Sequence, residues 1–243
     1  MTRKEAIKAN WKAMKQRPFS ERAKYIAANY WYMILLLLAA LILICSLLYG
    51  FFCKKESAMT GLLVNFNAVE STEAVSSKFC EYADLDPDLR PLEIIDNLRF
   101  SGEMDADSIY TMQFLNAYLS AGDLDFVISD KASFCYFAYL YEGVFSDIRS
   151  FLSEDEFQKL AGHILYIDQA QLAEREPSNE LSDYADPLCP EAMEMPIPVG
   201  IALDDNNTLF NSNASDNSAF LGIPANAENS EMLMIWIDYL LAG

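Results

Sequence analysis

Hydrophobic and polar residues form two patterns along this chain: one long apolar run, then a series of short ones. No charged residue occurs between Lys24 and Lys54, and the run itself, YMILLLLAALILICSLLYGFF, covers residues 32–52. As a helix this segment would rise roughly 31 Å, enough to cross a bilayer. The segment before this run is longer than the short basic segment that begins a signal peptide, and no small-residue cleavage site follows the run. The pattern predicts one transmembrane helix.

From residue 56 onward, short apolar runs alternate with amphipathic stretches. Runs typical of strands lie at residues 60–69, 91–100, 124–129, 197–204 and 219–225. Helical patterns cover residues 72–83, 106–120, 132–143 and 229–243, and Ser153 with Glu156 forms a capping box before another at 157–165. The alternation predicts an α/β domain, residues 56–243, with a mainly parallel sheet and helices on both faces.

Two local features refine this domain. In LSAGDLDFVISD (119–130), Gly122 ends a helix and a buried strand follows, an arrangement typical of the middle of a parallel sheet. Residues 169–196 instead contain four prolines, many acids and little periodicity. We expect this segment to be a long acidic loop.

The two ends of the chain carry opposite charge. Residues 1–55 contain ten Lys and Arg against two acids, a formal charge of +8, and residues 56–243 contain seven against 34, a formal charge of −27. The negative domain argues against nucleic-acid binding, which needs a basic surface. The positive-inside bias places residues 1–31 in the cytoplasm and the C-terminal domain outside the cell membrane.

The cytoplasmic segment is expected to be helical, with Ile7, Trp11 and Met14 on one side and lysines between them. It fits an amphipathic helix on anionic lipid or against a partner protein. It equally fits a topology signal whose basic residues retain the N-terminus inside. Both interpretations stay open.

Several stretches together resemble bacterial extracellular solute-binding proteins. They are LSAGDLDFVISDKASFCYFAYLYEGVFSDIRSFL (119–152), PVGIALD (198–204) and AFLGIPANAENSEMLMIWIDYLL (219–241). The resemblance implies the α/β fold of one lobe. In that family a second lobe is inserted before the returning strand, but here the interval is the 28-residue acidic loop, and a domain needs about 50 residues or more. The family's closing of two lobes around a ligand is therefore not expected.

A ligand cleft in an open α/β sheet lies beyond the carboxyl ends of its strands. Polar residues follow three of the predicted strands, and the candidate ligand-binding residues are Asn65, Asn67, Ser129, Asp130, Asp204 and Asp205. The alternative is that these side chains only cap helices and turns.

Enzyme motifs are scarce, so no catalytic residue, cofactor or metal site is predicted. The only histidine, His163, is expected in a helix with no nucleophile motif nearby. Asp84, Asp86 and Asp88 match the first positions of a calcium loop, but Leu89 stands where that loop needs glycine. Three cysteines, Cys80, Cys135 and Cys189, lie in the domain; Cys135 is expected in the core, and pairing of Cys80 with Cys189 is left open.

These patterns predict a bacterial single-pass membrane protein that is not an enzyme. It would contact lipid through residues 32–52 and present its outer domain as a ligand-binding or interaction module. The partner would be a small solute or another membrane protein. The alternative is a structural scaffold subunit of a membrane complex with no ligand of its own.

Overall fold

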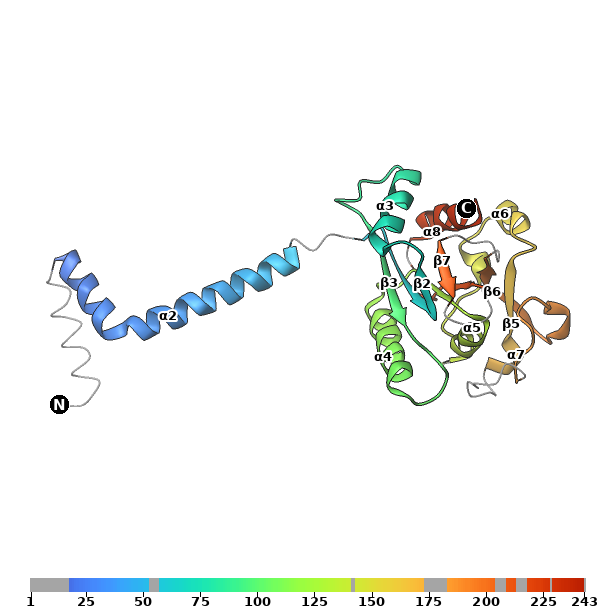
Figure 1. Cartoon of the computed structure of the whole chain (residues 1–243), viewed down its shortest axis with the longest axis horizontal. Helices are drawn as coiled ribbons and strands as arrows, with labels where there is room; N and C mark the ends of the chain where they lie inside the picture. The colour runs from blue at the N-terminus through green and yellow to red at the C-terminus, as the bar shows by residue number, and fades with distance from the viewer. Residues whose placement is uncertain are drawn as a thin grey trace. The chain divides into compact units, whose positions relative to one another are not determined.

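The computed structural model describes residues 18–52, 57–140, 143–172, 183–203, 209–212, 218–227 and 229–242. The chain divides into two compact units, residues 1–54 and 55–243. The described residues of the first unit form a long helix, and the second unit is an α/β fold (Figure 1).

The elements follow one another as α2 (Phe19–Phe52), β1 (Met59–Val64), β2 (Phe66–Ala68), α3 (Thr72–Tyr82), β3 (Leu92–Leu98), α4 (Ala106–Ala121), β4 (Phe126–Ser129), α5 (Lys131–Ala138), η2 (Ile148–Ser150), α6 (Glu154–Lys159), β5 (Ile164–Asp168), α7 (Gln169–Leu172), η4 (Pro190–Ala192), β6 (Pro196–Ala202), β7 (Phe210–Ser212), β8 (Phe220–Gly222) and α8 (Ser230–Ala242).

Six strands form the main sheet, in the order β3-β1-β4-β8-β6-β5. Strand β1 pairs in parallel with β3 and β4, whereas β8 runs antiparallel to β4 and β6, and β5 antiparallel to β6. Strands β2 and β7 form a separate antiparallel pair. The α/β class is confirmed, but the expectation of a mainly parallel sheet is wrong: the sheet is mixed.

The antiparallel half arises where the chain makes no long crossover helix. A parallel connection needs a crossover of a dozen or more residues, usually a helix, whereas antiparallel strands do not. Between β5 and β6 the described residues contain only the short α7 and η4. The sequence pattern concealed this because residues 164 and 165, assigned to the end of a helix from Ser153, begin strand β5.

Helices cover both faces of the sheet, as predicted. Alternate residues of β1 point to opposite faces, so Leu63 lies in one core with Phe79 of α3 and Trp236 of α8, while Leu62 lies in a second core with Phe134 of α5. Helix α4 adds to that second core, and Figure 1 shows α4 and α5 separated from α3 and α8 by the strands. Gly61 lets β1 approach the ring of Phe126, because a Cβ there would lie 2.0 Å from it.

Most other elements lie where the pattern placed them, with shifted ends. The first strand is interrupted at Asn65, whose φ of 62° lies in the left-handed region. Helix α4 ends at Gly122 with φ 73°, as predicted. Helix α5 ends at Ala138 instead of continuing to Gly143. Strand β7 was not predicted, because three residues are too few to show a period.

Helix α2 is continuous over 34 residues. Among the helices of the described residues, none combines the length and the apolar character that a membrane crossing requires. The expected span, residues 32–52, includes positions 34 and 47–52, whose side chains lie outside the described part, as do residues 1–17 of the expected basic segment.

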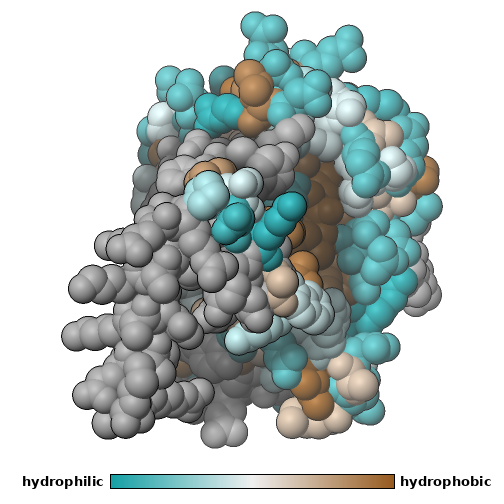
Figure 2. All heavy atoms as spheres, turned by 90° about the vertical axis from the view of Figure 1, so that its left-hand side faces the viewer, coloured by the Kyte–Doolittle hydropathy of each residue, from teal (hydrophilic) through white to brown (hydrophobic). Residues whose placement is uncertain are grey.

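The space-filling view shows a predominantly hydrophilic described surface on the face turned to the viewer, with hydrophobic residues gathered in smaller areas (Figure 2). Hydrophilic surface agrees with the high content of acids in residues 56–243. The many apolar residues of this unit are instead used in its two cores.

Candidate functional site

Two of the predicted site residues meet at the carboxyl ends of the parallel strands. Asn65 follows β1, and its Nδ2 donates to a carboxylate oxygen of Asp130 at 2.7 Å, to the carbonyl of Phe100 at 2.7 Å and to Ser133 Oγ at 3.1 Å. Its Oδ1 accepts from the N–H of Phe100 at 2.9 Å. One amide side chain thus joins the ends of β1, β3 and β4.

The same cluster begins helix α5. Asp130 is the N-cap residue, and its second carboxylate oxygen accepts from the N–H of Ser133 at 2.8 Å. These bonds correspond to the capping alternative considered for the strand-end residues. The polar atoms of Asn65 and Asp130 are thus engaged within the fold, and their role in ligand binding stays a prediction.

The remaining predicted site residues are distributed differently. Ser129 is fully buried between Val64 and Phe220 of the neighbouring strands, and its hydroxyl has no hydrogen-bond partner among the described residues. Asn67 belongs to the separate sheet, opposite Asn211. Asp204 and Asp205 lie outside the described residues.

A second polar cluster, which the sequence analysis missed, is built on Asp168 at the end of β5. Asp168 is 3% exposed, and its carboxylate accepts from the N–H groups of Ala170, Glu194 and Met195 at 2.9–3.1 Å. Burial alone would raise the pKa of Asp168, but these three N–H donors lower it, and the balance lies below the ordinary value. The backbone N–H of Asp168 donates to the hydroxyl of Tyr139 at 2.9 Å.

The Asp168 cluster fixes both ends of the acidic loop. Further along the loop, the carbonyl of Pro187 accepts from Tyr166 on β5 at 2.8 Å, Tyr184 stacks on Tyr139, and Asp186 forms an ion pair with Lys131. Of the described residues of the loop, 169–172 and 183–196, the second stretch therefore packs on this unit beside β5.

The histidine and the acidic turn make local contacts. His163 lies in the turn before β5, not in a helix as predicted, and its Nδ1 is 3.3 Å from the carbonyl oxygen of Ala202. Within the described ranges, no group of three or more His, Cys, Asp or Glu side chains is arranged to hold a metal. Asp86 accepts from the N–H of Asp88, forming a turn.

The described cysteines are free thiols. Cys80 is buried and Cys189 partly exposed, and they are not joined. Cys135 is a core residue, as predicted, and burial raises the pKa of its thiol to about 12. A thiol with that pKa stays protonated and unreactive near neutral pH.

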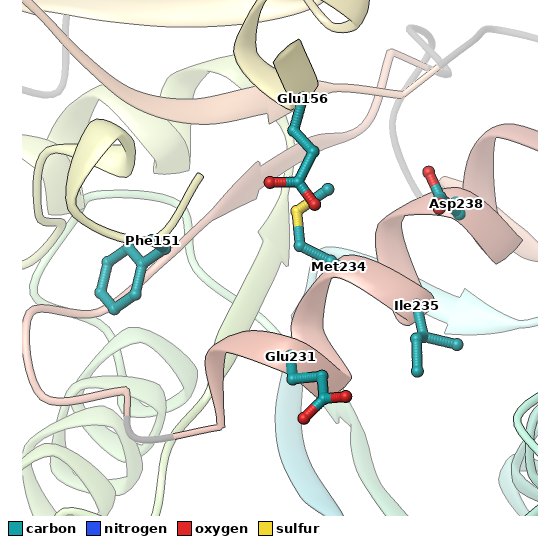
Figure 3. A pocket seen from close by; sticks show the side chains of 6 residues that line it. All are labelled: Phe151, Glu156, Glu231, Met234, Ile235 and Asp238. Atoms are coloured by element: carbon teal, nitrogen blue, oxygen red, sulfur yellow. The ribbon is translucent and has the colours of Figure 1, made fainter. Parts of the chain in front are cut away.

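A groove lies between α8 and the segment that contains η2 and α6 (Figure 3). Its volume is about 420 Å³. Apolar side chains from both sides line it: Phe151, Met234 and Ile235. Three carboxylates surround them: Glu156 of α6 and Glu231 and Asp238 of α8. In Figure 3 the side chain of Met234 extends toward the carboxylate of Glu156, and the two acids of α8 lie at either end of the apolar pair.

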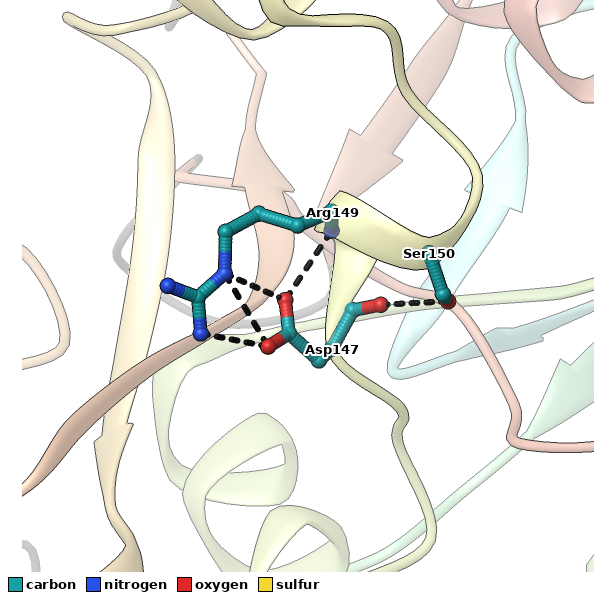
Figure 4. Close-up of polar contacts among 3 residues, drawn as sticks. All are labelled: Asp147, Arg149 and Ser150. Carbon is teal, nitrogen blue, oxygen red and sulfur yellow. Dashed lines mark hydrogen bonds and ion pairs between the residues drawn. The ribbon is translucent and has the colours of Figure 1, made fainter.

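One side of the groove is stabilised next to Phe151 by polar contacts among Asp147, Arg149 and Ser150 (Figure 4). Asp147 caps η2, and both its carboxylate oxygens accept from the guanidinium of Arg149. Ser150 Oγ donates to the carbonyl of Asp147 at 2.7 Å. Burial would raise the pKa of the Asp147 carboxyl, but the Arg149 bonds lower it below its usual value. These contacts orient the turn that ends at Phe151, and they engage the guanidinium of Arg149.

The sequence analysis predicted helix α8 but not its groove face. A signal was available. Glu231 and Asp238 stand seven positions apart around Met234 and Ile235, so all four share one side of a helix. The opposing wall carries no such signal, because only the fold brings Phe151 and Glu156 to α8.

No protein-family model, curated protein or solved structure matches this chain.

Proposed function

We propose that this protein is a single-pass membrane protein that presents its acidic α/β unit outside the cytoplasm as a binding or interaction module. The observation that carries the proposal is the exposure of α2. Every described large apolar side chain from Leu35 to Ile44 is at least 51% exposed. Helix α2 therefore offers a continuous apolar surface at these positions.

Water is a poor solvent for such a surface. Removing apolar area from water gains about 25 cal/mol per Å², and a helix that is apolar on all sides is typical of a protein core or a membrane. The described residues give no helix long and apolar enough for a crossing. The proposal therefore also uses residues 47–52 of the sequence, which extend the apolar run to 21 residues.

The orientation follows from charge. Eight Lys and Arg precede the run, and two, Lys54 and Lys55, follow it closely. The positive-inside bias then keeps the N-terminus in the cytoplasm and the α/β unit outside.

The engagement of Asn65 and Asp130 with each other supports interaction with a macromolecule over capture of a solute at the strand ends. The likeness to one lobe of a solute-binding protein stays a prediction, because no comparison identifies a family. The second candidate is a scaffold subunit that packs permanently on another membrane protein. Packing of the exposed apolar surface of α2 against other membrane helices would favour this candidate.

Topology is the decisive test. A reporter enzyme that is active only outside the cytoplasm should be active when fused after Gly243, and a reporter that fluoresces only in the cytoplasm should stay dark there. Fusions placed before Lys24 provide the matched control and should behave in the opposite way. A fluorescent fusion after Gly243 that washes off membranes in alkaline carbonate would contradict the proposal.

A further inference from the structure

The groove between α6 and α8 combines a partly buried apolar strip with three carboxylates. Its apolar residues, Met234 and Ile235, lie on the side of α8 away from the fully buried Trp236 and Ile237. The acids flank them seven residues apart, about 10 Å along a helix. The result is an apolar strip with a carboxylate at each end.

The two carboxylates of α8 are exposed. Among the described residues, Glu231 and Asp238 make no hydrogen bond or ion pair. Glu231 lies in the first turn, where a carboxylate is favoured, but Asp238 lies near the C-terminus, where the helix dipole disfavours one. The last turn of α8 contains no basic residue that would offset this cost.

The opposing wall adds negative charge. Glu156 accepts from the N–H and the hydroxyl of Ser153 in a capping box, and these bonds lower the pKa of its carboxyl, so it stays ionised near neutral pH. Lys159 also acts on Glu156 electrostatically, and the guanidinium of Arg149 is bound to Asp147. Three carboxylates therefore line the groove.

We propose that this groove docks a basic amphipathic helix of a partner protein. A cavity of about 420 Å³ holds one or two large side chains, not a whole helix. The partner would lie along α8 and insert an apolar side chain between Phe151 and Met234. Lys or Arg residues about two turns apart would meet Glu231 and Asp238, as in helix-in-groove recognition. The inference rests on the proposed role as an interaction module and names the partner's chemistry.

The test uses the full chain in nanodiscs of zwitterionic lipid and a labelled helical peptide of about 15 residues. The peptide carries two lysines seven positions apart with two leucines between them, and its binding is followed by fluorescence anisotropy. Empty nanodiscs define the lipid background. We expect saturable binding that weakens roughly tenfold in the double variant Glu231→Gln, Asp238→Asn, because two exposed ion pairs are lost. A peptide with glutamates in place of the lysines should not bind.

The control variant, Glu81→Gln with Glu103→Gln, removes the same charge from surface positions outside the groove and should bind as the wild type does. Equal losses in both double variants would overturn the proposal, since they would reflect net charge alone. A second test inserts a long side chain, Met234→Arg, into the groove; unchanged binding by this folded variant would also overturn it. Displacement of the peptide by millimolar butylamine would overturn the helical partner in favour of a small organic cation. An inverted orientation in the topology experiment would leave these measurements unaffected, because the peptide reaches both faces of a nanodisc, so the two proposals fail separately.

Discussion

Helix α8 and the apolar part of α2 are built from the same kinds of residues, mainly leucine, isoleucine and methionine with aromatic side chains. In α8, Leu233, Trp236 and Ile237 are at most 1% exposed because they pack on the sheet. In α2, Leu36 and Leu37 are at least 70% exposed. An apolar helix is held in a defined position only when other groups remove its apolar surface from water. For α8 the sheet does so, and for α2 we propose lipid.

The largest effect should come from charges in the middle of α2. Replacing Leu41 and Ile42 by arginine should cost about 6–8 kcal/mol of membrane insertion, because each arginine near the centre of a membrane helix costs about 3 kcal/mol and each lost aliphatic residue adds a little. The variant protein should be absent from the membrane fraction that resists carbonate extraction. In water the same change on an exposed helix would be nearly neutral.

The matched control exchanges the two residues, Leu41→Ile with Ile42→Leu, and should stay in the membrane. Full retention of the arginine variant in the carbonate-washed membrane would remove the contrast between the two helices.

The corresponding change in α8 is Trp236→Ala. This side chain is fully buried and contacts the rings of Phe79, Phe126 and Tyr239. Its loss should destabilise the α/β unit by about 3–5 kcal/mol and lower its melting temperature by roughly 6–20 °C. Calorimetry of the full chain measures the shift. Ile235→Ala, on the groove face of the same helix, should cost clearly less, and membrane retention should not change in either variant.

The Asp168 cluster provides a smaller, polar and pH-dependent contribution to the same unit. Because the folded pKa of Asp168 is lowered, its contribution to stability is present above the unfolded pKa of about 3.9 and is lost as pH falls through the folded value. Asp168→Asn should cost about 1–3 kcal/mol at neutral pH, since an amide cannot accept all three N–H bonds. It should also flatten the loss of stability below about pH 4.

Urea unfolding between pH 2.5 and 7 measures this dependence. Glu194→Gln is the control: its side chain is exposed and only its backbone N–H contacts Asp168. Parallel stability–pH curves for the wild type and Asp168→Asn would show that the acidic loop is held by other contacts.

Local signals explain which parts of the fold were predictable. Glycine at position 122 and the capping box of Ser153 and Glu156 specify their own backbone conformation, and both occur as expected. Strand β5 was missed because a run of five residues does not distinguish a strand from the end of a helix. The direction of β8 was not readable either, because strand pairing depends on where the chain returns, which a local pattern does not encode.

The candidate sites divide in the same way. Polar residues after strands were recognisable, and two of them do meet, but Asn65 and Asp130 are 65 positions apart in the chain, so only the fold brings them together. Only the α8 wall of the groove can be recognised in the sequence, from the spacing of Glu231 and Asp238. Its other wall comes from residues about 80 positions earlier in the chain.

By itself the sequence determined the uncharged run at residues 32–52, the opposite charges of the two ends and the alternation that gives an α/β class. These depend on composition and on short-range period, which each segment carries alone. Only the tertiary structure decided the mixed sheet, the mutual engagement of Asn65 and Asp130, the fixing of the acidic loop by Asp168 and the acid-lined groove. Each of these depends on hydrogen bonds or packing between residues far apart in the chain, and such contacts form only when the whole unit folds.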